Sequence, residues 1–248
     1  MKNILFLFLL PLYLFSQDNF IDVNGLKQGY WEIFFPYNND SIVSEEGVFL
    51  NDVEDGLWIK YHDNGQVREL LNYNQGQLDG IRIVISNKGK LLEQEFFILG
   101  DYHGRQIYFH DNGKLRSEEF FYFGERHGLF SKYYRNGKKQ EAISYLNNEK
   151  NGFSRWYFDN EQLSVQYSYN EGLIVDTVFT FYKTGELKSK SIYSLNELNG
   201  EKIIFYPSGV VKEKGFFDDG KKQGDWCFYD STGLKINCEK YKKGVLYE

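Results

Sequence analysis

The stretch GLWIKYHDNG, residues 56–65, decides the fold, because close copies of it return along the chain at a constant interval. Its opening glycine recurs every 24 residues, with one aspartate in the series. These positions are Gly56, Gly80, Gly104, Gly128, Gly152, Asp176, Gly200 and Gly224. An earlier copy opens at Gly29, with three extra residues before Gly56. A fixed period of this length indicates a repeat protein, here of about nine copies.

Positions in a copy are counted from its opening residue, position 0, and several of them keep one kind of side chain. Position 5 holds Phe34, Tyr61, Ile85, Phe109, Tyr133, Tyr157, Phe181, Phe205 and Tyr229. Position 17 holds Tyr73, Phe97, Phe121, Tyr145, Tyr169, Tyr193, Phe217 and Tyr241. Glycine recurs at positions 9 and 20, and asparagine replaces it twice at position 20. Both residue types accept a positive φ, so these positions predict turns.

Each copy is predicted to form one antiparallel β-hairpin, because aromatic-rich runs favour strands and the Asp-Asn-Gly between them favours a turn. Pro207 favours a three-residue loop, since proline suits the second position of a type I turn and a following glycine suits the left-handed position. That loop sets position 5 opposite position 11, which is Val or Leu in most copies, and such pairs stabilise a sheet. Positions 3, 5, 11 and 17 are then expected to share the core face.

The chain is therefore predicted to be all-β, an elongated single-layer array of antiparallel β-hairpins in which each copy contacts mainly its neighbours. The columns resemble the MORN repeat in its bacterial variant, which reads G-x-W-x-x-Y-x-x-N-G and then Y-x-x-G. Residues 56–65 with Tyr73-Asn74-Gln75-Gly76 are close to this pattern in full, and residues 224–233 are a second good copy. The tryptophan column departs from it in six copies. The resemblance implies a sheet that binds other proteins, and bacterial members are often antitoxin-like.

The first residues predict export. Lys2 is followed by the apolar run Ile4 to Phe15 and then by Ser16, the order of a secretory signal peptide. The run is shorter than the roughly 20 residues that span a bilayer comfortably. We expect a cleaved signal peptide at residues 1–16, a repeat domain at residues 17–248, and a secreted or periplasmic location. The alternative is an uncleaved membrane anchor, whereas no membrane span is expected after cleavage.

Charge and residue spacing argue against nucleic acid and metal as partners. The formal net charge of −6 does not suit phosphate binding, which needs a concentrated positive field. His62 and His110 share position 6 two copies apart, roughly 20 Å, and His103 and His127 are one copy apart, roughly 10 Å. Ligands of one metal ion lie about 2 Å from it, so we predict neither a metal site nor a cofactor.

Carboxylates form their own columns, at positions 13 and 15, and include Glu69, Glu93, Glu95 and Glu141. A hydrolase would need two of them about 5–9 Å apart, which neighbouring copies could supply. Lysine and arginine are plentiful nearby, so a solvated charge ladder is the better interpretation, and no catalytic residue is predicted. These columns conflict with the predicted core face: either a bulge reverses the strand there, or that part of the face is wet.

Cys227 and Cys238 flank the turn of the last full hairpin. Export favours a disulfide between them, which would staple the end of the array. A two-residue loop would set them directly opposite each other, whereas the three-residue loop displaces them by one position and leaves two free thiols as the alternative.

The candidate binding residues are aromatic side chains on the face opposite the predicted core columns. They are Phe130, Tyr134, Trp156, Phe158, Tyr182 and Tyr206. A contiguous exposed aromatic patch marks an interface, and the alternative is a twisted sheet with both faces partly buried. We expect a non-catalytic extracytoplasmic scaffold that binds a protein. The alternatives are a glycan or cell-envelope binding module and an antitoxin-like role against an exported toxin; self-association through open sheet edges is a further option.

Overall fold

The computed structural model describes residues 19–36 and 42–247, which fall into two compact units divided after Gly89. The predicted signal peptide, residues 1–16, lies outside the described residues. Every regular element in the described ranges is a β-strand. These ranges contain no helix long and apolar enough to cross a membrane.

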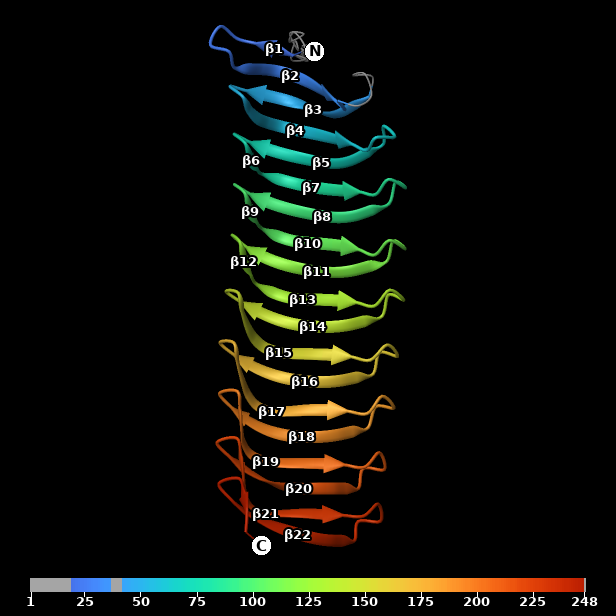
Figure 1. Cartoon of the computed structure of the whole chain (residues 1–248), viewed down its shortest axis with the longest axis vertical. Coiled ribbons are helices and arrows are strands. Elements are labelled where there is room, and N and C mark those ends of the chain that lie inside the picture. The colour runs from blue at the N-terminus through green and yellow to red at the C-terminus, as the bar shows by residue number, and fades with distance from the viewer. Residues whose placement is uncertain (1–18, 37–41, 248) are drawn as a thin grey trace, which may run out of the picture. The chain divides into compact units, whose positions relative to one another are not determined.

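The strands of each unit pair antiparallel in chain order (Figure 1). Unit 1 contains β1 (Phe20–Ile21), β2 (Lys27–Phe34), β3 (Val43–Leu50), β4 (Val53–Tyr61), β5 (Val67–Asn74), β6 (Gln77–Leu78) and β7 (Gly80–Ile85). Unit 2 begins with β8 (Leu91–Ile98), β9 (Asp101–Tyr102), β10 (Gly104–Phe109), β11 (Leu115–Tyr122), β12 (Glu125–Arg126), β13 (Gly128–Tyr133), β14 (Lys139–Leu146) and β15 (Glu149–Tyr157). It continues with β16 (Leu163–Asn170), β17 (Leu173–Phe181), β18 (Leu187–Ser194), β19 (Glu197–Phe205), β20 (Val211–Asp218), β21 (Lys221–Tyr229), β22 (Lys235–Lys242) and β23 (Val245–Leu246). The predicted all-β hairpin array is confirmed.

From the copy of Gly56 onward, the loop within each hairpin has the predicted three residues. In the copy of Gly56 the His62 N–H donates to the Gln66 carbonyl at 2.8 Å, and the Gly65 N–H donates to the His62 carbonyl at 2.9 Å. Gly65 has a φ of +79°, the left-handed value that favours glycine. Tyr61 then pairs with Val67, as position 5 was expected to pair with position 11.

A β-bulge follows this loop, which is one of the two alternatives predicted from the carboxylate columns. Lys60 pairs with Glu69 while Tyr61 pairs with Val67, so Arg68 at position 12 is an extra, bulged residue. The same shift recurs in the later hairpins, for example between Trp156 and Tyr157. Because a bulge reverses the alternation of side chains, positions 13, 15 and 17 lie with positions 2 and 4, opposite positions 3, 5 and 11.

The predicted core face is therefore wrong for position 17. The more deeply buried face carries positions 2, 15 and 17, as Trp58, Leu71 and Phe97 show with exposed fractions of 2%, 4% and 7%. The glutamates at positions 13 and 15 lie on this face too, which resolves their apparent conflict with the core columns. The other face is shielded in its middle as well, where Ile107 and Ala142 are buried.

Two tryptophans pack directly against glycine backbone across the boundary between copies. A Cβ added at Gly47 would lie 2.3 Å from Trp58, and one added at Gly215 would lie 2.3 Å from Trp226. In unit 1 Trp58 also meets the Phe49 ring edge to face, with centroids 4.8 Å apart. The indole N–H of Trp58 donates to the Val48 carbonyl at 3.1 Å, and that of Trp226 donates to the Phe216 carbonyl at 3.3 Å. Each indole therefore occupies the space that a side chain at the glycine would fill.

Candidate interaction surface

Exposed apolar side chains gather on one part of unit 2. They come from β8 to β13 and comprise Phe96, His103, Phe120, Tyr122, Phe123, His127 and Leu129, which we call the aromatic–histidine surface. The five apolar and aromatic members are each between 40% and 61% exposed. Since a soluble monomer seldom leaves a contiguous group of this kind uncovered, it is a candidate interface.

Ring contacts make this surface continuous. His103 lies 4.8 Å from Phe123 and 5.5 Å from Tyr122, measured between ring centroids. Tyr122 in turn meets Phe123 at 4.9 Å and His127 at 6.4 Å. Phe96 joins through His103 at 6.5 Å. The surface is thus held in place by its own rings, and it offers a fixed apolar shape.

A hollow of about 480 Å³ opens on this surface. It is lined by His103, Gly104, Phe120, Phe121, Tyr122, His127, Gly128 and Leu129. Both glycines open strands with a positive φ, and the carbon nearest to a Cβ at Gly128 would be that of Phe120, at 3.7 Å. Because glycine has no side chain, Gly104 and Gly128 at position 0 leave the bottom of the hollow unfilled.

The turns between copies carry an unusual residue here. Leu99 and Phe123 stand at position 19 with φ of +47° and +45°, a conformation that bulky side chains seldom adopt. Leu195 is a third apolar residue at this position, with a φ of +49°, whereas five other copies place Gln75, Asn147, Glu171, Asp219 or Lys243 there. Leu99 and Phe123 are 58% and 50% exposed, so little burial offsets the strain. Strain of this kind concentrates at functional sites.

A row of carboxylates borders these tips, on Asp101, Glu125 and Glu149, and we call it the acidic row. Each is the direct cross-strand partner of position 18, so Glu125 pairs with Tyr122 and Glu149 with Leu146. Within the described residues none of the three is ion-paired, whereas the nearby arginines are: Arg105 bonds Glu118, and Arg126 bonds Glu119 at 3.0 Å.

The six aromatic residues predicted to form an exposed patch are all half-buried. Phe130 and Trp156 occupy positions 2 and 4 and so lie on the more buried face, where Trp156 meets Tyr167 edge to face at 5.6 Å. The prediction of one exposed patch is therefore corrected. It rested on the core-face assignment that the bulge at position 12 overturns.

The other members, at position 6, bind the next copy instead. The O–H groups of Tyr134, Tyr182 and Tyr206 donate to the position 5 carbonyls of Tyr157, Phe205 and Tyr229, at 2.8, 2.6 and 3.0 Å. His62 and His110 make the same contact through Nε2, at 2.9 and 3.0 Å. Phe158 stands at this position without a polar atom. Position 6 thus fastens neighbouring copies to each other.

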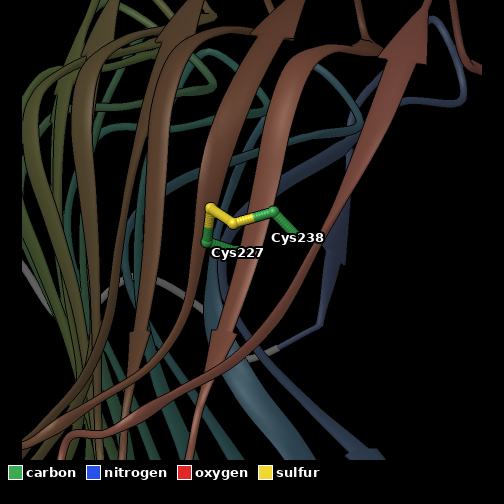
Figure 2. Close-up of a disulfide and its surroundings, with 2 residues drawn as sticks. All are labelled: Cys227 and Cys238. Atoms are coloured by element: carbon green, nitrogen blue, oxygen red, sulfur yellow. A yellow bond between two sulfur atoms is a disulfide. The ribbon is translucent and has the colours of Figure 1, made fainter. Parts of the chain in front are cut away.

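Cys227 and Cys238 are bonded in a disulfide that joins β21 to β22 (Figure 2). They are direct cross-strand partners. The bulge at position 12 compensates for the three-residue loop, because it shifts the strand by one residue and brings position 3 opposite position 14. The displacement expected from the loop alone is therefore absent.

The carboxylate columns are largely paired. Glu69 bonds Arg82 at 3.1 Å, and Glu141 lies 3.6 Å from Lys132. Glu95 is buried and accepts from the O–H groups of Tyr102 and Tyr108, both at 2.9 Å. Burial and this carboxylate raise the pKa of Tyr108. The described part of the chain has no group of three or more His, Cys, Asp or Glu side chains placed to hold a metal ion.

The fold and the repeated turns define a β-hairpin repeat protein. The sequence model of the family described as MORN repeat variant matches residues 54–75, 102–122, 126–147 and 198–219. The chain is a MORN-repeat protein, and MORN repeats generally mediate protein or membrane interactions. The second and third matches cover most of the aromatic–histidine surface. No curated protein matches the sequence.

This surface was not predicted from the sequence, although positions 18 and 19 carry a signal for it. Positions 18 and 19 are mostly polar, yet Tyr122 and Phe123 are aromatic. Two adjacent aromatic residues at these turn positions, one of which needs a positive φ, are the observation that would have identified the surface.

Proposed function

We propose that this protein is a non-catalytic, extracytoplasmic scaffold that binds another protein through the aromatic–histidine surface. The observation that carries the proposal is the exposed, strained Phe123 inside a continuous group of rings. Protein interfaces are enriched in aromatic side chains at their centre, and such residues supply most of the binding free energy.

The extracytoplasmic part of the proposal is supported by two features. The apolar run behind Lys2 has the length and order of a signal peptide. The Cys227–Cys238 disulfide suits an oxidising compartment, since cytosolic disulfides are rare.

The non-catalytic part is supported by how the ionisable side chains are used. Glu69 and Glu141 are ion-paired, and His62 and His110 bond backbone carbonyls. Groups held in this way serve the architecture of the sheet. They are not gathered around a common point where a substrate could react.

The test uses two matched variants of one turn position. Phe123→Asn removes a ring from the surface, and Leu195→Asn makes the corresponding change at a distant tip. Both replacements suit a positive φ, which is +45° and +49° at these residues, so neither should weaken the fold.

The exported protein would be cross-linked to its neighbours in a cell-envelope preparation and recovered, and its first residue sequenced. We expect a mature chain that begins near Gln17 and a stoichiometric protein partner that is retained by Leu195→Asn and lost with Phe123→Asn. A partner unaffected by Phe123→Asn, a chain that keeps its first residues in the cytoplasm, or catalytic turnover by the purified chain would contradict the proposal.

Glycan binding is the second candidate, favoured by the exposed Tyr122 ring, because rings of this kind stack on sugars. A glycan array probed with the wild type and with Phe123→Asn separates the two candidates. Hits that disappear in the variant would replace the protein partner with a sugar.

A further inference from the structure

We propose that the aromatic–histidine surface and the acidic row together bind a cationic amphipathic segment of the partner, in which every third residue is Lys or Arg and apolar side chains lie between them. This inference rests on the proposed function and names the chemistry of the partner.

The first step is the pairing of apolar and acidic side chains on three consecutive tips. Ile98 pairs with Asp101, Tyr122 with Glu125, and Leu146 with Glu149. Cross-strand partners lie on the same face of a sheet, about 5 Å apart. Each tip therefore presents one apolar and one negative group side by side.

This pairing is confined to these three copies. The equivalent pairs elsewhere in the described part of unit 2 are Asn170–Leu173, Ser194–Glu197, Asp218–Lys221 and Lys242–Val245, and none of them joins an apolar residue to an acid. The amphipathic tips and the ring cluster thus occupy the same stretch of the sheet.

The second step is the charge that is left unbalanced. Arg105 and Arg126 already bond Glu118 and Glu119, so they do not neutralise the acidic row. Asp101 reaches the next tip, since its Oδ1 would lie 3.5 Å from a Cβ at Gly124. A negative row beside an apolar hollow attracts a partner with positive charge and repels an anionic lipid surface.

The third step is spacing. Consecutive copies are two strands apart, so the carboxylates of the acidic row repeat at roughly 10 Å. A polyproline II segment has three residues per turn and rises about 3.1 Å per residue, so every third side chain repeats at about 9 Å on one side. A segment with a basic residue at every third position therefore matches the row, and its remaining apolar side chains face the rings.

The probe is a dye-labelled peptide of four Lys-Leu-Pro repeats, measured by fluorescence anisotropy against the mature disulfide-bonded protein. Two matched peptides replace Lys by Glu or Leu by Ser throughout. Vesicles with anionic headgroups, measured by co-sedimentation, form a separate arm for membrane binding.

Four variants locate the site. Phe123→Asn and Glu125→Gln change the surface and the acidic row, and Leu195→Asn and Glu197→Gln make the same changes at a tip that lacks the ring cluster. We expect at least tenfold weaker binding for Phe123→Asn, since a central aromatic anchor is lost. We expect about fivefold weaker binding for Glu125→Gln, with a loss that shrinks as salt is added.

The two peptides that lack charge complementarity or apolar side chains should each bind at least tenfold more weakly than the probe, and the two control variants should bind like the wild type. Equal binding of the Glu peptide, equal loss in the control variants, or binding of anionic vesicles would overturn the inference. If cross-linking captures a partner through Phe123 while the cationic probe does not bind, the proposed function stands and this inference falls. If no partner is captured and the cationic probe does not bind, both the proposed function and this inference are wrong.

Discussion

Replacing Gly215 by alanine should destabilise the last hairpins of unit 2, although alanine is the better strand residue. Gly215 has no positive φ, so alanine carries no backbone strain there and would alone gain about 0.5–1 kcal/mol over glycine. The new Cβ would however lie 2.3 Å from the Trp226 indole, whereas carbon atoms in contact prefer about 3.5–4.0 Å.

The indole must therefore retreat by more than about 1 Å, and overpacking of this kind costs about 1–3 kcal/mol. The difference predicts a net loss of up to about 2.5 kcal/mol. In a Trp226→Ala background the same replacement meets no ring, so Gly215→Ala should become neutral or stabilising. The double-mutant cycle isolates the contact from the intrinsic preference of the residue.

Stacked repeats do not unfold in one step, so a global midpoint would blur the effect. Hydrogen exchange of the amides in β20 to β22 reads the local opening free energy instead. Gly215→Ala should lower the local opening free energy in these strands and leave it unchanged in β10 and β11. A stabilising Gly215→Ala in the wild type, or the same cost with and without Trp226, would refute the proposed steric contact.

Three further predictions concern the links within and between copies. Phe158→Tyr should stabilise the neighbouring strands by about 0.5–1 kcal/mol, since its O–H would reach a carbonyl of the next copy as in three other copies. Hydrogen exchange of the amides in β15 to β18 tests this, and unchanged exchange rates would contradict it. Burial and the hydrogen bond to Glu46 raise the pKa of Tyr61 to about 12, so its contribution to stability should be complete below pH 10 and be lost as pH rises to about 12. Absorbance titration of wild type minus Tyr61→Phe should show that late phenolate, and ionisation near pH 10 would refute it. Reduction of Cys227–Cys238 should speed exchange in β21 to β23 by the equivalent of about 2–3 kcal/mol and leave β10 unchanged, whereas uniform loss along unit 2 would exclude a local staple.

Periodicity gave the fold class, the hairpin and the three-residue loop, because each of these depends on residues that recur in every copy. Pro207 and the glycines at position 9 sufficed to pair position 5 with position 11. The bulge at position 12 left no such mark, since Arg68, Gln140 and Lys188 occupy it without a common property. An extra residue present in every copy does not alter the period of 24, so columns alone could not reveal it.

That single residue explains most of what was mispredicted. It moved position 17 to the other face, placed Phe130 and Trp156 on the buried side, and brought Cys227 directly opposite Cys238. The aromatic–histidine surface was missed for a different reason. It arises from residues that are particular to a few copies, whereas the predictions rested on positions whose residue type is shared by most copies.

The contacts of Trp58 with Gly47 and of Trp226 with Gly215 have a consequence for how such a chain can be lengthened or recombined. Each contact joins the second strand of one copy to the first strand of the next. The first contact joins β3 to β4, and the second joins β20 to β21. A tandem duplication of the copy at residues 224–247 would set the second tryptophan against Glu239, which stands at position 15 in place of glycine. One that starts and ends in the turn at positions 7 to 9 would carry both the tryptophan and its glycine. The segment that keeps each tryptophan with its glycine therefore runs from one hairpin turn to the next, whereas the sequence motif begins at the opening glycine. Grafts between such proteins should be joined at the hairpin turns.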